Sequence, residues 1–252
     1  ARVVQDVLAL SKREKFNVNI IEAFDQPWKR ALEGTVGGHW GLFDAATRAP
    51  KFAGAQAVSN HPLWIWQGAG GIIFAVIVFV AAMRVRTKDT PPWLWLAVSA
   101  NAFVGGVLIG WTVENIPIES LGVGGWSRSL ALAAVAIVAP IVLSAATMCG
   151  TPVPAYFRIL GPKKERMQNR LAVSAGLVLI LTMLLAFVVA LALVFDPRYR
   201  DFPFAPLTAA VVPFLVHRLA VTLPKGTRPA AETVGASVLA LSLAAAGAWA
   251  MP

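Results

Sequence analysis

Residues 171–195 read LAVSAGLVLILTMLLAFVVALALVF, an apolar stretch without a charged side chain. A bilayer core about 30 Å thick is crossed by about 20 apolar residues in a helix that rises 1.5 Å per residue. The stretch therefore predicts a membrane-spanning helix. Five further stretches meet or approach this length and predict, with the first, a polytopic transmembrane bundle of about six helices in a mainly α protein: 63–83, 93–113, 128–149, 205–223 and 230–250.

The stretch 205–223 leaves two interpretations open, because it holds Pro206, Pro213, His217 and Arg218. Proline removes a backbone donor from a helix, and non-helical backbone at membrane depth is tolerated only where protein or water surrounds it. Arg218 lies near the end of the stretch, where its long side chain can reach the interface. We expect a full span here rather than a re-entrant turn.

The composition agrees with a membrane class. Hydrophobic residues make up 57% of the chain and charged residues 14%, whereas soluble domains carry about 25% charged residues. The net charge of +9 does not indicate a nucleic-acid partner, because the basic residues are dispersed in loops instead of gathered on one soluble face. The single cysteine, Cys149, lies in an apolar run and cannot build a metal cluster. We expect neither a metal nor a cofactor.

Basic residues divide the loops into two groups. The first, third and fifth loops hold most of them: Arg84, Arg86 and Lys88, then Arg158, Lys163, Lys164, Arg166 and Arg170, then Arg218, Lys225 and Arg228. The second and fourth loops hold only Arg128, Arg198 and Arg200. Loops rich in lysine and arginine stay in the cytoplasm. We therefore expect the residues before the first span on the other side, which in a bacterium is the periplasmic side of the inner membrane.

The residues before the first span carry a different pattern. Residues 1–15 predict an amphipathic helix, and residues 16–24 read as a strand. A dense polar and aromatic cluster and the glycine-rich loop 34–44 follow. A helix, a strand and a functional loop at the strand's C-terminal end are typical of one unit of a (β/α)8 TIM barrel. We expect residues 1–57 to be the C-terminal remnant of such a barrel, with its front missing, and residues 58–252 to be the membrane domain.

One long motif in this region resembles a known family. Residues 19–44, NIIEAFDQPWKRALEGTVGGHWGLFD, with PKF at 50–52, closely resemble the final strand and loop of glycoside hydrolase family 17. This family comprises β-1,3-glucan hydrolases and transglycosylases built on a TIM barrel. The resemblance extends to bacterial membrane-anchored members, including proteins of periplasmic β-(1,3)/(1,6)-glucan synthesis, in which a similar barrel precedes a polytopic membrane part. It covers residues 1–52, and the membrane part is also similar around residues 195–204.

The resemblance implies a sugar-contacting loop but no catalytic group on this chain. Retaining glycosidases need two carboxyls about 5–5.5 Å apart. In this family both come from earlier strands of the barrel, so we expect no catalytic residue here and no activity of this chain by itself. The substrate-binding residues implied are Glu22, Asp25, Gln26, Trp28, Lys29, Glu33 and Trp40. Glu22, at the end of the predicted strand, suits either a wall of the site or a buried hydrogen-bonding group.

The other roles also have two interpretations. Lys29 and Glu33 match a lysine and an acid that lie near the cleft of plant members, although two residues fewer separate them here, and Gln26 stands where plant members have an acid. Trp28 and Trp40 are suited to stack on glucose rings. The alternative is structural, with both indoles packed in the barrel and Lys29 paired with Glu33.

We expect the full protein to be an inner-membrane enzyme that cuts or rearranges β-1,3-glucan in the periplasm. Its expected partners are a β-glucan oligo- or polysaccharide, the lipid bilayer and a glycosyltransferase domain or subunit. Two other functions stay open, namely a non-catalytic membrane module that assists glucan synthesis or export, and a small-solute transporter. A transporter needs polar or ionisable groups in its spans, and the candidates are Asn101, Glu114, His217 and Arg218.

Small residues recur at a spacing of four in two of the predicted spans. They are Gly106 and Gly110 in one span and Ala236, Ala240 and Ala244 in the last. This spacing lets two helix backbones approach closely. The pattern predicts close packing within the bundle, with a dimer interface as the alternative.

Overall fold

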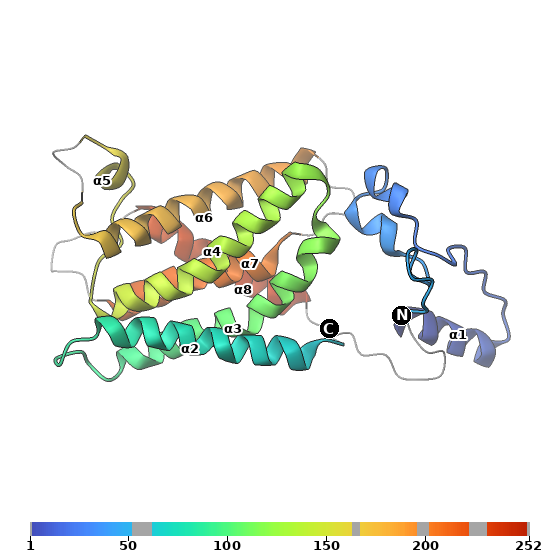
Figure 1. The fold of residues 1–252 in the computed structure, drawn as a ribbon, viewed down its shortest axis with the longest axis horizontal. Coiled ribbons are helices and arrows are strands. Elements are labelled where there is room, and N and C mark those ends of the chain that lie inside the picture. Colours follow the sequence, from blue (N-terminus) through green and yellow to red (C-terminus); the bar gives the residue numbers. More distant parts are fainter. Residues whose placement is uncertain (1, 52–61, 163–166, 196–201, 222–230, 251–252) are drawn as a thin grey trace.

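The computed structural model describes residues 2–51, 62–162, 167–195, 202–221 and 231–250, with only the backbone for residues 231–233 and 244–250. The predicted boundary between residues 57 and 58 lies outside these ranges. The described chain consists of an N-terminal region (residues 2–51) and an elongated bundle of apolar helices (Figure 1).

The bundle contains six apolar helices, one on each of the predicted stretches. They are α2 (Trp64–Val85), α3 (Leu94–Glu119), α4 (Gly122–Met148), α6 (Arg170–Phe195), α7 (Phe204–Ala220) and α8 (Ala231–Ala250). Four of them, α2, α3, α4 and α6, are long and apolar enough to cross a membrane, whereas α7 and the described side chains of α8 form shorter apolar segments. The prediction of a mainly helical chain is confirmed, and four of its helices have the length and apolar composition of membrane spans.

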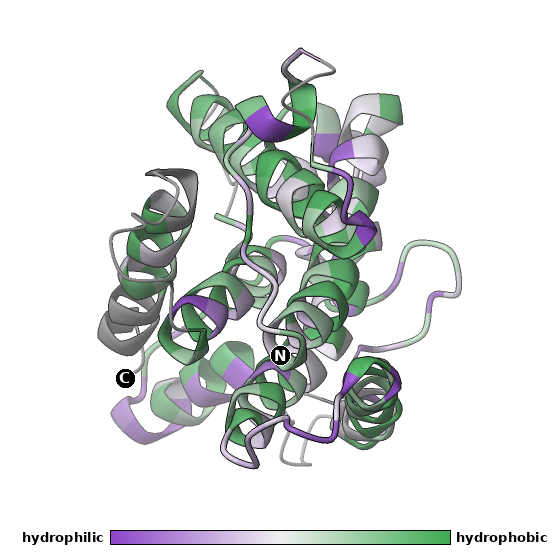
Figure 2. Cartoon of the chain, turned by 90° about the vertical axis from the view of Figure 1, so that its left-hand side faces the viewer, coloured by the Kyte–Doolittle hydropathy of each residue, from purple (hydrophilic) through white to green (hydrophobic). Residues whose placement is uncertain are grey.

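Large apolar side chains face outward along the bundle. Ile72 is 69% exposed and Phe103 is 72% exposed, and Figure 2 shows that hydrophobic residues occur along the helices of the bundle. Soluble proteins rarely expose a continuous apolar surface of this kind. The outer face of the bundle therefore suits the hydrocarbon of a lipid bilayer.

Helix α7 occupies the middle of the bundle. It has 17 residues, so it is about 25 Å long, and it packs against α3, α4 and α8. Leu207, Val211 and Phe214 are fully buried. Because neighbouring helices surround α7, its prolines and His217 lie within protein, whereas Arg218 near its end is exposed. The predicted span 205–223 is thus a helix that ends at Ala220.

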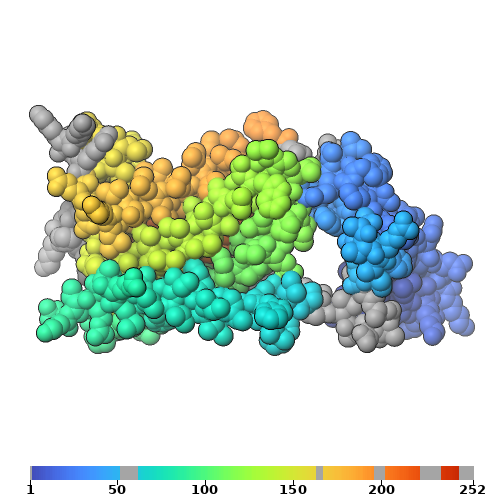
Figure 3. All heavy atoms as spheres, viewed as in Figure 1, coloured from blue at the N-terminus to red at the C-terminus, as the bar shows by residue number. Residues whose placement is uncertain are grey.

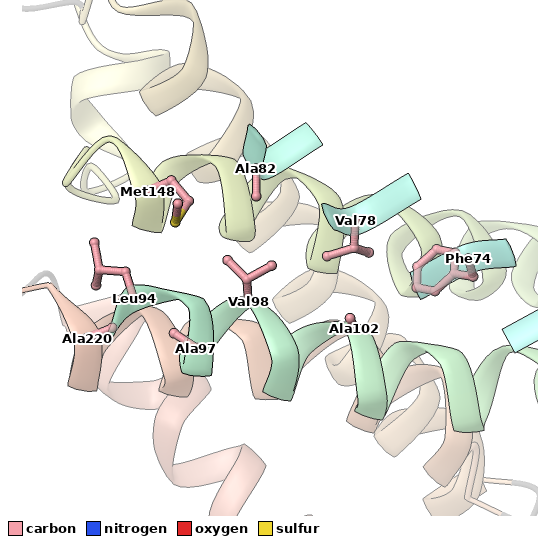
Figure 4. Packing of buried hydrophobic residues seen from close by; sticks show 9 residues of the cluster. All are labelled: Phe74, Val78, Ala82, Leu94, Ala97, Val98, Ala102, Met148 and Ala220. Atoms are coloured by element: carbon pink, nitrogen blue, oxygen red, sulfur yellow. The ribbon is translucent and has the colours of Figure 1, made fainter. Parts of the chain in front are cut away.

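Helices α2 and α3 pack at van der Waals distance through glycines. A Cβ atom built on Gly106 would lie 2.9 Å from the carbonyl oxygen of Gly71, and one on Gly110 would lie 2.6 Å from Cβ of Gln67. Nearer to the loop between α2 and α3, the two helices pack through larger side chains, with Val78 of α2 and Val98 of α3 pointing toward one another (Figure 4). The predicted close packing of the glycine pair within the bundle is confirmed.

In the last helix, Ala236 and Ala240 are buried against α6 and α7, whereas the side chain of Ala244 lies outside the described part. The alanine pattern thus serves packing inside the bundle at the two positions that can be seen.

The N-terminal region confirms the predicted helix and corrects the predicted strand. Helix α1 covers Arg2–Glu14, and two short 3-10 helices follow, η1 (Pro27–Ala31) and η2 (Thr35–His39). Residues 16–24 are extended, but the prediction of a strand is wrong, because they join no sheet among the described residues. Phe24 makes only an isolated parallel bridge to Phe43. A strand needs the backbone groups of a neighbour, and no TIM-barrel remnant is seen in residues 2–51.

The N-terminal region sits at one end of the bundle, beside the turn between α3 and α4 (Figures 1 and 3). The loop between α2 and α3 lies at the opposite end, as does the segment between α4 and α6 with its short helix α5 (Phe157–Leu160). The predicted basic residues 163–166 and 225–228 lie outside the described residues. The first basic loop and the N-terminal region are thus separated by the length of the bundle.

Candidate functional site

Four of the predicted substrate-binding residues line one shallow hollow of about 600 Å³, which we call the N-terminal hollow. Glu22 comes from the extended segment, Lys29 from η1, Glu33 from the turn after η1, and Trp40 from the end of η2. Leu32 lies on the same wall. The chain therefore brings charged groups from three successive segments to one apolar-rimmed surface.

Lys29 is the centre of an ion-pair group in this hollow. Its Nζ donates a hydrogen bond to the Glu22 carboxylate and lies 3.5 Å from Oε1 of Glu33. The hydrogen bond to Glu22 raises the pKa of Lys29 above its usual value, so the ammonium persists throughout the physiological range. The structural pairing of Lys29 with Glu33 is thus present, and Glu22 shares it.

Each glutamate keeps one oxygen unsatisfied. Oε2 of Glu22 and Oε2 of Glu33 are buried and have no hydrogen-bond partner among the described residues. Buried polar atoms in folded proteins are nearly always paired with protein, water or a ligand. Two unfilled acceptors beside an exposed aromatic face suit a ligand that carries several hydroxyl donors.

Asp25, Gln26 and Trp28 are not among the residues that line the hollow. Asp25 is buried, and its Oδ1 accepts hydrogen bonds from Lys51 Nζ at 2.5 Å and from the backbone of Gly41 at 3.0 Å. Gln26 accepts from the Trp28 indole at 2.8 Å. These three side chains therefore do not share the pocket of the other four predicted residues. Asp25 instead holds the loop through Gly41 and Lys51.

Neither tryptophan is packed in a core. Trp28 is 60% exposed and Trp40 is 45% exposed, so the structural alternative of buried indoles does not hold in the described region. The two differ in place, because only Trp40 borders the N-terminal hollow. Trp28 lies beside Lys29, whose Nζ is 5.8 Å from the centre of the indole ring.

A glycine permits the backbone contact that shapes the site. A Cβ atom on Gly41 would lie 2.7 Å from the carbonyl oxygen of Phe24 and closer still to the backbone nitrogen of Asp25. The close approach lets Phe43 donate its backbone N–H to Ala23 at 2.9 Å and accept from Asp25 at 3.0 Å. The loop is thereby held against the end of the extended segment that carries Glu22.

The closing segment of the motif supplies a residue that the sequence prediction left out. Lys51 binds Asp25 and also donates to the backbone oxygen of His39 at 2.7 Å. It therefore ties the last residue of η2 to the buried carboxylate. Its position in the PKF motif at 50–52 could have indicated a role for Lys51 in the site, although the motif alone does not identify its partner.

Arg30 fastens the N-terminal region to the bundle and was also missed. Its Nη2 donates to the backbone oxygens of Pro117 at 3.3 Å, Ile118 at 3.0 Å and Ser120 at 2.8 Å. These carbonyls end α3, where a helix leaves its last acceptors unpaired and carries a partial negative charge. A guanidinium group suits such an end because it presents several donors in a planar fork.

Three of the four candidates for transport form hydrogen bonds to another helix of the bundle. Glu114 accepts a hydrogen bond from Gln67 of α2, and Nδ2 of Asn101 donates to Ser144 at 3.0 Å. His217 is buried and lies 2.9 Å from the hydroxyl of Thr147. Arg218 is exposed. Polar side chains that bond across helices stabilise a bundle, so these contacts have a packing role.

Comparisons with known proteins found no match to the chain among protein-family models, curated proteins or solved structures. The geometry of the N-terminal region and the motif of residues 19–52 are therefore the features that point to a function.

Proposed function

We propose that this chain is the membrane-anchored part of a β-1,3-glucan-processing glycoside hydrolase or transglycosylase similar to family 17. The supporting observation is that Glu22, Lys29, Glu33 and Trp40, all within the family-like motif, line one hollow. In this proposal the chain contributes a wall of the glucan cleft and the membrane anchor. The catalytic carboxylates come from outside the chain, which by itself is inactive.

The chemistry of the hollow suits a sugar. Glucose hydroxyls both donate and accept hydrogen bonds, and Oε2 of Glu22 and of Glu33 are two acceptors that lack a protein donor in the described residues. The ammonium of Lys29 supplies donors beside them and fixes the carboxylates in place. Trp40 offers a flat amphipathic ring for the apolar face of a glucose unit.

The binding surface is tested first at its tryptophans. We expect Trp40→Ala to raise the Kd for a soluble β-1,3-linked gluco-oligosaccharide about tenfold or more, as buried aromatic contacts in binding sites commonly do. The measurement is isothermal titration calorimetry on the detergent-solubilised chain. Trp28→Ala is the matched control, because Trp28 is also exposed to solvent but does not border the hollow.

The proposal would be overturned by equal Kd values for wild type and Trp40→Ala, or by equal affinity for an α-1,4-linked oligosaccharide of the same length. A loss of affinity confined to Trp28→Ala would also contradict it, because the binding surface would then lie outside the hollow.

The proposed orientation places residues 1–57 in the periplasm and the basic loops in the cytoplasm of a bacterium. It is supported by the separation of the N-terminal region from the loop that carries Arg84–Lys88 and by the tendency of basic loops to remain cytoplasmic. We expect a membrane-impermeant maleimide to label Ser11→Cys in intact spheroplasts, and Lys88→Cys only in inverted vesicles.

Both labelling variants carry Cys149→Ala, because Cys149 is the only native cysteine. Labelling of both positions from one side of the membrane would refute the orientation and the periplasmic role together.

A further inference from the structure

Two more hollows lie where the N-terminal region meets the bundle. The junction hollow, of about 380 Å³, lies between residues 30–35 and the turn from α3 to α4. The bundle-end hollow, of about 340 Å³, lies between η2 and the adjoining ends of α3, α4 and α7. Figure 3 shows the N-terminal region seated against this end of the bundle. Neither hollow contains a residue of the predicted substrate-binding set.

The three hollows follow one another along the molecule. Leu32 lines both the N-terminal hollow and the junction hollow. Thr35, Glu119 and Arg128 line both the junction hollow and the bundle-end hollow. Because each hollow shares wall residues with the next, an extended ligand can occupy them in sequence.

Two polar side chains that line the bundle-end hollow lack a hydrogen-bond partner among the described residues. Asn115 lines it, is half-buried, and makes no side-chain hydrogen bond among the described residues. Ser129 also lines it and is 5% exposed, yet its hydroxyl has no partner in the described part of the chain. An unpaired polar group at such a depth is unfavourable, so a ligand that bonds these side chains is stabilised.

The charges of this end do not favour an anion. Arg128 faces the hollow together with Glu119, and the guanidinium of Arg30 already serves the backbone oxygens at the end of α3. The remaining polar lining consists of hydroxyl and amide groups, and Trp111 adds an indole that is 46% exposed. A neutral polyhydroxylated chain meets these conditions better than a phosphate headgroup, which needs an excess of donors and positive charge.

We propose that the three hollows form one track for a linear oligosaccharide, which runs from the N-terminal hollow past Leu32 to the end of the bundle. The proposal rests on the proposed glucan function and extends it. A glucan bound at Trp40 continues along the junction with several further units, and Asn115 and Ser129 hold its far end near the membrane surface. The site therefore prefers long linear oligosaccharides to short ones.

The test compares a β-1,3-linked trisaccharide with a heptasaccharide on the full chain in detergent. For wild type we expect a Kd at least about tenfold lower for the heptasaccharide, as additional paired hydroxyls contribute to affinity. Asn115→Leu should raise the heptasaccharide Kd about three- to tenfold, the effect of losing a neutral hydrogen bond. The same variant should leave the trisaccharide Kd unchanged, because the shorter ligand ends before Asn115.

Ser129→Ala gives a second measurement, and this substitution is not expected to perturb the fold. Its hydroxyl bonds to no described residue, so its removal should leave the melting temperature unchanged while weakening the heptasaccharide alone. Ser120→Ala is the matched control, because Ser120 is also buried with an unpaired hydroxyl but does not line the bundle-end hollow.

The outcomes separate the two proposals. Equal affinity of wild type for both oligosaccharides, or an equal loss for both in Asn115→Leu, overturns the track and leaves the N-terminal hollow as the binding site. An effect of Ser120→Ala equal to that of Ser129→Ala also overturns it. Failure of wild type to bind either oligosaccharide overturns the glucan function itself.

Discussion

Gly71→Ala is expected to lower the free energy of unfolding of the bundle by about 1–3 kcal/mol, the usual range for overpacking a filled interior. The added Cβ would lie 3.0 Å from the carbonyl carbon of Gly106 and closer still to its oxygen. Real Cβ atoms do not approach backbone so closely, and the backbone of α3 cannot move aside as a flexible side chain would. The two helices must therefore separate, which loosens the packing of Phe74 and Val78 of α2 in the core cluster that they share with α3. Equilibrium unfolding in mixed detergent, followed by tryptophan fluorescence, measures the loss.

Gly68→Ala is the control for this experiment. Gly68 belongs to the same helix, but a Cβ built on it meets no atom within 4 Å. Alanine is the better helix former by up to about 1 kcal/mol, so this variant should be neutral or slightly stabilised. Equal destabilisation by the two substitutions would show that the α2–α3 contact is not the cause.

Arg30→Ala is expected to release the N-terminal region from the bundle, with a loss of about 1.5–3 kcal/mol, the range for hydrogen bonds to a charged group. The substitution removes the donor to Pro117, Ile118 and Ser120 together. It also frees the backbone oxygen of Thr35, which accepts from Arg30 Nε at 3.1 Å. Amide hydrogen exchange should therefore accelerate in residues 27–39, while exchange in the middle of α4 stays as in wild type.

Two further variants define the cause. Arg30→Lys keeps the charge but loses the planar fork, so partial release is expected. Arg48→Ala removes an exposed arginine of the same region and should change nothing. If Arg30→Ala leaves the exchange of residues 27–39 unaltered, the guanidinium does not hold the junction.

The six helices were predictable because each depends on a local property, a continuous apolar run. In α2, α3, α4 and α6 this run is long enough to cross a bilayer. The ends of the helices were less predictable. The predicted span 93–113 stops before Glu114, yet α3 continues to Glu119, and the Glu114 carboxylate accepts a hydrogen bond from Gln67 of α2. Such a partner lies on another helix, and no local pattern reveals it.

The N-terminal region shows the same division. The spacing of Lys29 and Glu33 predicts their pair, since residues four apart share one side of a helical turn. The strand prediction for residues 16–24 was wrong because alternating apolar residues describe a suitable side-chain pattern but not the presence of a neighbouring strand. Arg30 and its acceptors are separated by about 90 positions, and its carbonyl partners leave no trace in side-chain identity.

Arg30 binds main-chain oxygens at the end of α3, so the two sides of this contact tolerate substitution unequally. Every residue type presents the same carbonyl, so positions 118 and 120 can drift in identity during evolution as long as α3 keeps its course. Position 30 has no such freedom, because one side chain supplies all the donors. An N-terminal region attached in this way keeps its attachment while the side chains at the end of α3 change.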